Sequence, residues 1–400
     1  MMAGRNSSIN SVERVSHDLV SRYTEQPLRF AYYEHFVTSP PMRQSRRASS
    51  RVNRLVVIFI IVASGFLLLY KNTQQFTQID RECIQDEWQE NNNLGNTIDD
   101  GSNFRIAFTD IQQNYTWLHL PNFLENSEIL MIVSSNCDNF ARRNILRKTW
   151  MNPENSQIIG DGRMKALFLV GINGADEKLN AVVLEEAKVF GDMIVIDLED
   201  NYLNLSYKTI SLLLYSISKT KSPNLIGKID EDVLFYPDQL TPLINDKTIN
   251  TSTFSIYGEK YEAGVAVNHG EDNAKWQISK NSFKCSVYPS YLSGPTYFLT
   301  RKAAKRIVEA TKHRKFISVD VEDVFITGLL AGDVGIKKNQ LPFMYMIEEA
   351  TNDRESYEIL AWHTKKRDQQ YIEAFESLKL NRCKSCRKSK NPDLEELKEK

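Results

Sequence analysis

The chain has 400 residues, in which 50 basic side chains nearly balance 51 acidic ones, so its formal net charge at pH 7 is −1. No overall electrostatic field therefore attracts a nucleic acid, and we expect no nucleic-acid partner. The length exceeds the roughly 100–200 residues of a typical single domain, which leaves room for one large domain and attached segments.

The N-terminal region divides into a polar tail and an apolar run. Residues 1–54 are rich in Ser and Arg and show no apolar period, so we expect a disordered tail. Residues 55–70 (LVVIFIIVASGFLLLY) carry no charge. This run is close to the roughly 17–25 residues that span a bilayer, and its shortness favours a thin early-secretory membrane. We predict a single transmembrane signal-anchor, with a buried core helix as the alternative.

Charges on the two sides of this run predict the topology. Five arginines lie between residues 43 and 54, whereas Lys71 and Arg81 are diluted by neighbouring acidic residues. The positive-inside rule therefore places the N terminus in the cytosol and the rest of the chain in the lumen. We expect a type II protein of the Golgi membrane, with residues 71–127, rich in Asn, Gln and Asp, as a lumenal stem.

All five cysteines lie on the predicted lumenal side, where disulfides form. An odd number leaves at least one unpaired within the chain, and Cys83 in the stem could join two chains as a homodimer. Cys383 and Cys386 lack the βαβ context of a redox motif, so a disulfide or unreactive thiols are expected. The same topology permits glycosylation of three sequons, at Asn114, Asn204 and Asn250.

A folded domain is expected over residues 128–380, followed by a charged tail over 381–400. Apolar strands alternate with amphipathic helices, which predicts βαβ units and an α/β fold with a mainly parallel sheet flanked by helices. The expected strands are 130–135, 166–171, 193–198 and 225–230, and the expected helices are 141–150, 177–190 and the segment around 210–217.

The last of these strands ends in two carboxylates that can face one pocket. Asp230 and Asp232 are separated by one residue, and alternate strand residues point the same way. Ligands of such sheets gather at the carboxyl ends of strands. A divalent cation held by Asp232 could bridge the diphosphate of a nucleotide sugar, while Asp230 contacts the ribose or a metal-bound water. The alternative is a solvated acidic turn.

Six ordered blocks around this motif resemble the β-1,3-galactosyltransferase family (glycosyltransferase family 31), which includes β-1,3-N-acetylglucosaminyltransferases. The blocks are RRNILRKTW (142–150), LFLVG (167–171), EEAKVFGDMIVIDLEDNYLNLSYKT (185–209), KIDEDVLFYP (228–237), YPSYLSGPTYFLT (288–300) and VEDVFITG (321–328). The resemblance implies a GT-A type nucleotide-sugar-binding fold, a UDP-sugar donor, Mn²⁺ or a similar ion, inversion at the anomeric carbon, and a glycan acceptor on a glycoprotein or glycolipid.

Four basic residues are candidates for binding the donor. Arg143 and Arg147 are four residues apart on one helix face and could present guanidinium groups to phosphate or uracil, although a salt-bridged structural arginine is an equal alternative. Lys208 and Lys228 could offset the diphosphate charge. Lys228 could equally pair with Asp230.

Two carboxylates at the start of a later helix are candidates for the acceptor. Glu322 and Asp323 could simply cap the helix, but an inverting transfer needs a base for the acceptor hydroxyl. The resemblance implies that Asp323 is this base, and we expect Glu322 to orient the acceptor. It also implies a metal contact from a C-terminal histidine, for which His363 is the candidate, with an unpaired surface imidazole as the alternative.

Three features depart from the family pattern. The middle acidic residue is Glu231, the segment before Tyr297 contains Pro295, and the acceptor-segment tryptophan corresponds only loosely to Trp276, which is otherwise a core residue. Three functions follow from the sequence: transfer of galactose, transfer of N-acetylglucosamine, or a non-catalytic lumenal chaperone or partner of an active transferase. Retention of all three aspartates favours catalysis, because a protein that only binds has no need of them.

Overall fold

A computed structural model describes residues 59, 62–65, 95–122, 126–270, 277–280, 283–316, 321–346, 358–364 and 366–389, with side chains of the last helix up to Lys379. The chain forms two compact units, residues 1–68 and 69–400. In the first unit, the described residues Phe59 and 62–65 are helical. No helix among the described residues is long and apolar enough to cross a membrane, and most of the predicted anchor, 55–70, lies outside those residues.

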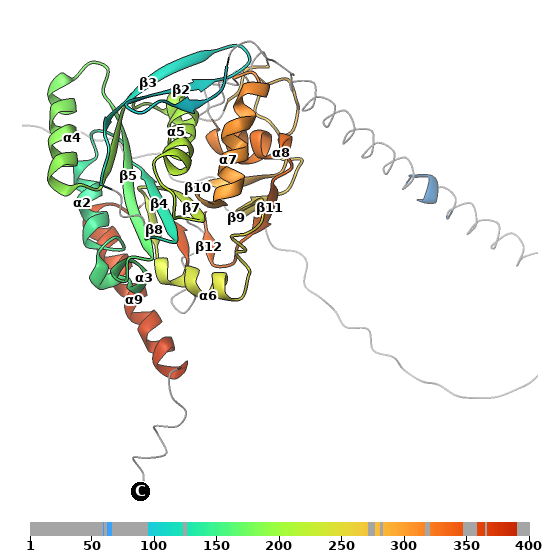
Figure 1. Cartoon of the computed structure of the whole chain (residues 1–400). Coiled ribbons are helices and arrows are strands. Elements are labelled where there is room, and N and C mark those ends of the chain that lie inside the picture. Colours follow the sequence, from blue (N-terminus) through green and yellow to red (C-terminus); the bar gives the residue numbers. More distant parts are fainter. Residues whose placement is uncertain are drawn as a thin grey trace, which may run out of the picture. The chain divides into compact units, whose positions relative to one another are not determined.

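In the second unit, ten of the described strands form one sheet (Figure 1). Their order is β1-β2-β3-β6-β5-β4-β7-β10-β9-β11. The strands are β1 (Ile98–Asp99), β2 (Asn103–Ala107), β3 (Gln112–His119), β4 (Ile129–Ser134), β5 (Met164–Ile172), β6 (Met193–Glu199), β7 (Leu225–Asp230), β9 (Ser255–Tyr261), β10 (Tyr291–Thr300) and β11 (Lys337–Gln340).

The sheet is mixed, which corrects the prediction of a mainly parallel one. Strands β6, β5, β4 and β7 are parallel, as the alternation of strands and helices predicted. Strands β1 to β3 and β10 join this centre through antiparallel pairings on its two sides. These outer strands follow hairpins or lack a crossover helix, so the βαβ argument does not apply to them.

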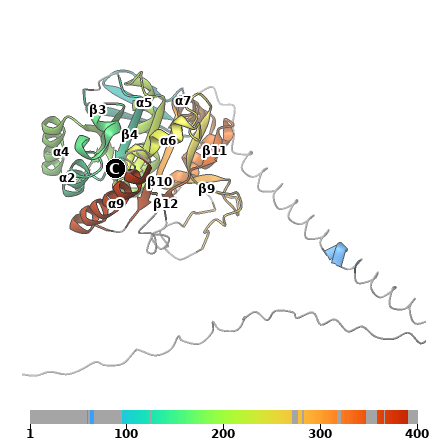
Figure 2. The ribbon, with the colours of Figure 1, turned by 90° about the horizontal axis from the view of Figure 1, so that it is seen from below.

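Helices cover both faces of the sheet, because alternate residues of the central strands point to opposite sides. Even-numbered Leu130 and Ile132 join one core cluster, with α5 (Leu205–Ser218) and α7 (Arg301–Ala310). Odd-numbered Met131 and Val133 join the other. That face carries α2 (Phe140–Lys148), α3 (Gln157–Gly160), α4 (Glu177–Phe190), α6 (Leu240–Asn245) and α9 (Asp368–Ser389). Figures 1 and 2 both show α4 at one end of this unit and β11 towards the other, with α7 between them.

The folded domain begins before residue 128, so the predicted stem is too long. Strands β1 to β3 already belong to the sheet, and Phe104 and Trp117 stack with ring centroids 4.1 Å apart in the core beneath α5. Asn and Gln are frequent on the exposed side of these strands. The sequence of this stretch therefore looked polar, although apolar residues alternate on its buried side. At the other end, α9 runs past the predicted boundary at residue 380.

A second, three-stranded sheet consists of β12 (Met344–Tyr345), β13 (Ala361–His363) and β8 (Val233–Phe235). Strand β8 follows the acidic end of β7, and its pairing with β13 sets His363 opposite Val233. This small sheet therefore brings a C-terminal segment beside Asp232.

Two cysteines with described side chains have different states. Cys137 is a free, buried thiol, in line with the odd number of cysteines. Cys285 is disulfide-bonded.

Candidate active site

A cavity of about 800 Å³ opens at the carboxyl ends of the central parallel strands. Ser134 ends β4, Asp200 follows β6 and Asp230 ends β7, so three of the four central parallel strands deliver polar residues to one edge. The far side of the cavity is built by β9, β10 and the segment before the π-helix η5 (Val324–Leu330). Most of the residues that the sequence predicted for the site line this cavity: Lys208, Lys228, Asp230, Asp232, Glu322, Asp323 and His363.

Asp232 and His363 form a close pair, although 131 residues separate them. The Nε2 atom of His363 lies 3.2 Å from Oδ2 of Asp232, and its Nδ1 atom lies 3.1 Å from the carbonyl oxygen of Met346. Burial would raise the pKa of Asp232, but the hydrogen bond and charge of His363 outweigh it, so the pKa lies below its usual value. In turn, the hydrogen bond with Asp232 raises the pKa of His363. Oδ1 of Asp232 is buried and has no hydrogen-bond partner among the described residues.

Lys228 is a buried cation between two carboxylates. Its Nζ lies 2.7 Å from Oδ1 of Asp230 and 3.5 Å from Oε2 of Glu322, and it donates to the carbonyl of Gly294 at 2.7 Å. Burial alone would lower the pKa of Lys228. The charges of Asp230 and Glu322 raise this pKa by a larger amount, so it lies above its usual value and the amine stays protonated. Burial and the charge of Asp232 raise the pKa of Asp230 to about 6 although Lys228 opposes this. Lys228 therefore pairs with Asp230, one of the two roles that the sequence allowed.

Asp323 lies at the start of η5, where its carboxylate accepts the N–H of Val324 at 2.9 Å. A β-bulge in β10 brings Gly294 against it, and a Cβ at position 294 would sit 3.1 Å from Oδ2 of Asp323. Burial and the charge of Glu322 raise the pKa of Asp323 to about 7. Glu322 itself is buried and accepts the hydroxyl of Tyr297 at 2.6 Å.

The profile of the galactosyltransferase family matches residues 141–342, half of the chain, and this stretch carries Lys208 to Asp323 of the cavity. The chain belongs to the galactosyltransferase family. Among curated relatives, it is 28% identical over 211 residues to beta-1,3-galactosyltransferase 1 of mouse and of human, a match covering 52% of this chain and 61% of the relative. It is 29% identical over 241 residues to mouse lactosylceramide 1,3-N-acetyl-beta-D-glucosaminyltransferase, covering 58% and 62%. The chain thus spans about three fifths of these relatives.

Solved structures give weaker likenesses. A glycosyltransferase involved in glycosylation of the major capsid of PBCV-1 aligns with a TM-score of 0.32 and 11% identity over 62% of this chain and 98% of that one. Mouse xyloside xylosyltransferase 1 in its apo form aligns with a TM-score of 0.29 and 10% identity over 60% and 97%. Scores this low support no argument about the site.

A divalent cation, which the family resemblance implies, fits the Asp232–His363 pair. The unpartnered Oδ1 of Asp232 is a buried acceptor without a donor, which an ion would satisfy. The hydrogen bond from Nδ1 of His363 to a backbone carbonyl would leave Nε2 as the ligand atom. Among described side chains, no group of three or more His, Cys, Asp and Glu is placed to hold an ion. Two protein ligands leave coordination positions for diphosphate oxygens.

Lys208 lines the half of the cavity next to β4 and β6. Its Nζ donates to the carbonyl of Ser135 and to Oδ1 of Asp200, both at 2.7 Å. Oδ2 of the same Asp200 accepts the N–H of Gly171 at 3.1 Å. The amine is buried but faces the cavity, so it remains a candidate for contacting a diphosphate.

Arg143 and Arg147 do not line this cavity. Arg143 is 1% exposed and holds Glu186 of α4 with a shortest distance of 2.6 Å. Arg147 bonds Glu186 and Asp192, each at 2.8 Å. These contacts support the alternative that the sequence left open, in which the arginines are salt-bridged structural residues joining α2 to α4. The four-residue spacing correctly predicted that both arginines lie on one helix face. It did not predict that this face meets Glu186 and Asp192.

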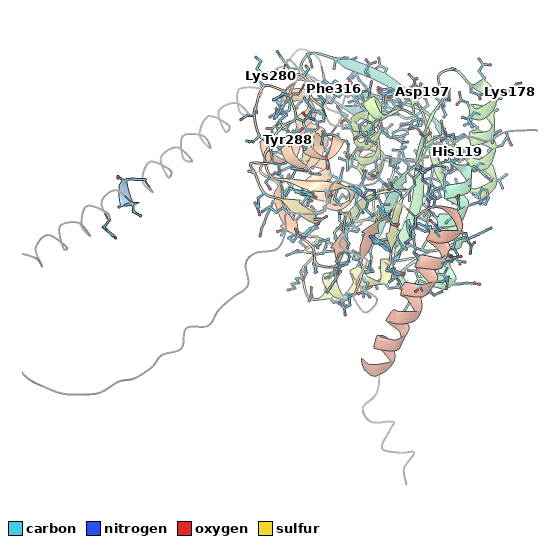
Figure 3. All side chains as sticks on the ribbon, turned by 180° about the vertical axis from the view of Figure 1, so that it is seen from behind. His119, Lys178, Asp197, Lys280, Tyr288 and Phe316 are labelled. Atoms are coloured by element: carbon cyan, nitrogen blue, oxygen red, sulfur yellow. The ribbon has the colours of Figure 1, made fainter. Side chains whose placement is uncertain are left out.

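Several residues that the sequence did not predict also line this cavity. They are Tyr261, Tyr288 and Tyr291, with Ser293 beside them. Tyr288 and Tyr291 belong to the fifth resemblance block, a few residues before Gly294, and this position was the available signal. Figure 3 shows Tyr288 on the side of the domain away from Lys178 of α4. Trp276 lies outside the described residues.

Proposed function

We propose that this galactosyltransferase-family protein transfers galactose from UDP-galactose in a β-1,3 linkage to a glycan acceptor, with inversion and with a divalent cation. One observation carries the proposal: the paired ligands Asp232 and His363 share a cavity with Asp323, whose carboxyl has a pKa of about 7. The lowered pKa of Asp232 suits a cation ligand, and the raised pKa of Asp323 suits a general base.

In this reaction, Asp323 accepts the proton of the acceptor hydroxyl while the hydroxyl oxygen attacks the anomeric carbon. The bond between that carbon and the β-phosphate oxygen breaks, and UDP leaves with the electron pair. Lys228, which is paired with Glu322, donates to the carbonyl of Gly294, and Gly294 lies against Asp323, so the base keeps its position. Asp232 and His363 would hold the cation, which supplies positive charge next to the diphosphate.

N-acetylglucosamine is the second candidate for the transferred sugar, because the relatives include a 1,3-N-acetylglucosaminyltransferase at similar identity. The test incubates the full chain with Mn²⁺, a range of glycan acceptors, and UDP-galactose or UDP-N-acetylglucosamine. We expect UDP release and a new glycosidic bond with one donor, suppression by EDTA, and loss of transfer in Asp323→Asn.

A non-catalytic chaperone would give a different result. Absence of transfer with every donor and acceptor, together with intact binding of UDP, would contradict the proposed enzyme and favour a binding role. Unchanged transfer in Asp323→Asn would instead show that another group is the base.

We further propose that residues 55–70 anchor the protein in the Golgi membrane with residues 71–400 in the lumen. The support is the uncharged run and its flanking arginines. Protease added to sealed microsomes should digest only the N-terminal tail. Digestion of the C-terminal domain would contradict this topology.

A further inference from the structure

Glu231 stands between the two aspartates of the turn after β7 and has partners of its own. The aspartates bond Lys228 and His363. The carboxylate of Glu231 instead accepts the hydroxyl of Ser135 at 2.5 Å, and its other oxygen accepts the side-chain amide of Asn139. The three acidic side chains therefore turn in three directions, and the proposed transfer uses only two of them.

These bonds continue the pairing of β4 with β7 beyond the end of the sheet. The two parallel strands are in register as far as Ser134 and Asp230. Ser135 and Glu231 come next on each strand, and a side-chain bond joins them where the backbone ladder ends. Ser135 is 1% exposed. Glu231 thus fastens the turn after β7 to residues 135–139, which we call the β4–α2 loop.

Asn139 contributes to this link instead of capping its own helix. It is the N-cap residue of α2, yet its side chain makes no capping hydrogen bond. Asparagine is favoured at this position because its side-chain oxygen accepts a free helix N–H. In this chain the side chain is held by Glu231. The contact between loop and turn therefore replaces a local one.

The β4–α2 loop carries donor-side groups to the cavity. Ser135 and Asn136 line it, and the carbonyl of Ser135 accepts the Nζ of Lys208 at 2.7 Å. On the other side of the link, Glu231 directly precedes Asp232 in the chain. One carboxylate therefore connects the segment that holds Lys208 to the segment that carries the proposed cation ligand.

We propose that Glu231 is a positioning residue of the donor site: it holds the β4–α2 loop, and through it Lys208, at a fixed separation from Asp232. This inference rests on the proposed function, in which the diphosphate of the UDP-sugar lies beside the cation held by Asp232. A diphosphate binds more tightly to groups that are already in place, because they need no ordering on binding. Loss of the link should weaken donor binding and leave acceptor binding unchanged.

This role requires a side chain of a particular length. A carboxylate one methylene shorter would end about 1.5 Å further from its two donors, beyond hydrogen-bond reach. An amide of the same length can keep both contacts, with its oxygen accepting from Asn139 and its nitrogen donating to Oγ of Ser135. A cation ligand would show the reverse pattern, since aspartate keeps the negative charge that attracts a cation and glutamine removes it.

The test compares Glu231→Asp with Glu231→Gln in the full chain. Calorimetric titration with UDP in the presence of Mn²⁺ gives the Kd, and the transfer assay gives the KM of donor and acceptor. We expect Glu231→Asp to raise the Kd of UDP and the KM of the UDP-sugar about tenfold, as for one lost hydrogen bond to a charged group. The acceptor KM should not change. Glu231→Gln should stay within about threefold of wild type.

A compensating variant tests the contact itself. Asn139→Gln adds the methylene that Glu231→Asp removes, so the double variant should regain about threefold of the lost UDP affinity. Glu128→Asp is the matched control, because Glu128 also joins two segments, holding Arg163 at 2.9 Å, but lies where β4 begins, at the opposite end from the cavity. The control should bind UDP as wild type does.

Three results would overturn the proposal: an unchanged Kd of UDP in Glu231→Asp, an equal loss in Glu231→Gln, or no recovery in the double variant. If Glu231→Asp does not fold, Asn139→Ala removes one bond from the loop side. It should raise the Kd of UDP at least threefold, and an unchanged Kd would again overturn the proposal.

A failure of the proposed function gives a different result. Wild type that binds UDP but transfers no sugar contradicts the enzyme, and the calorimetric comparison of the Glu231 variants still decides the positioning role. Wild type that does not bind UDP contradicts both.

Discussion

The carboxyl groups of Asp232 and Asp323 face the same cavity but ionise at different pH. The hydrogen bond and charge of His363 lower the pKa of Asp232. Its carboxylate therefore stays charged, as a cation ligand requires. Burial and Glu322 hold the pKa of Asp323 near 7, so its carboxylate can take up a proton at physiological pH. The difference comes from the surroundings: His363 of β13 lowers the pKa of Asp232, whereas burial and the adjacent Glu322 raise the pKa of Asp323.

Transfer should therefore depend on the ionisation of Asp323. A base acts only when deprotonated, so kcat/KM should rise with pH and level off above about 7. Steady-state rates from pH 5.5 to 8.5 at saturating Mn²⁺ measure this. Asp323→Asn should reduce kcat by roughly 10²–10⁴-fold. A profile that keeps its ascending limb in the Asn variant would assign that limb to another group.

The same carboxyl should make stability depend on pH. Its folded-state pKa of about 7 exceeds the unfolded value of 3.8, so the folded protein binds the proton more tightly. Stability from this group is present below the unfolded pKa and is lost as pH rises through the folded pKa. Wild type should therefore lose stability between pH 5 and pH 8, whereas Asp323→Asn should not. The melting temperature of the variant should rise relative to that of wild type over this range. A constant difference would mean that Asp323 titrates normally.

At the scale of single elements, the ion pairs of Arg143 and Arg147 join α2 to α4. Both side chains of the Arg143–Glu186 pair are 1% exposed, so neither charge can regain water if its partner is lost. The pair therefore holds two helices on one face of the sheet, and Arg143 also donates to Ser135 and Asn136, which line the cavity.

Arg143→Met should lower the free energy of unfolding by about 3–5 kcal/mol, because it leaves Glu186 buried with one partner fewer. Urea unfolding measures this. The double variant Arg143→Met with Glu186→Leu should recover part of the loss, since no unpaired charge remains. A double variant that is no more stable than Arg143→Met would contradict this account of the unpaired Glu186 charge.

A glycine holds β5 close to the segment after β6. A Cβ at Gly171 would lie 2.4 Å from the carbonyl oxygen of Leu198 and 3.0 Å from Cβ of Asp200. The nearest atom belongs to the backbone, so an alanine at position 171 would force β5 and β6 apart. The movement would also shift Asp200, which accepts the hydrogen bond from Lys208. This position therefore couples strand packing to the cavity.

Gly171→Ala should destabilise the protein by about 1–3 kcal/mol and raise the KM of the UDP-sugar. Gly332→Ala is the control, because its added Cβ would meet only Nζ of Lys338, at 3.7 Å, among the residues that the structure describes. Thermal melts and donor kinetics of both variants make the comparison. Equal stability of the two would show that the sheet adjusts around position 171 without cost.

At the scale of the whole molecule, the sequence predicted those parts that depend on local pattern. The apolar runs of β4 to β7 and the period of α4 and α5 gave strands and helices where the structure has them. The pairing of His363 with Asp232 depends on β13 joining β8, a long-range contact that no local pattern encodes. The stack of Tyr261 on Tyr291 likewise depends on the register between β9 and β10, which pairs these two residues.

The stem was overestimated for the same reason. Strands β2 and β3 have one polar side and one apolar side, and the polar side dominates their composition. Their apolar side chains matter only once β3 pairs with β6 and α5 covers them.

This arrangement predicts where the chain can be shortened. A chain starting at Leu69, the first residue of the second compact unit, should fold and melt cooperatively. A chain starting at Glu128 lacks β1 to β3, so it exposes the edge of β6 and the core surface that Phe104 and Trp117 cover. It should aggregate or bind a hydrophobic dye. Far-UV circular dichroism and size-exclusion chromatography of the two chains decide between them. Cooperative folding of the chain from Glu128 would show that β1 to β3 are an attachment to the domain and not a part of its core.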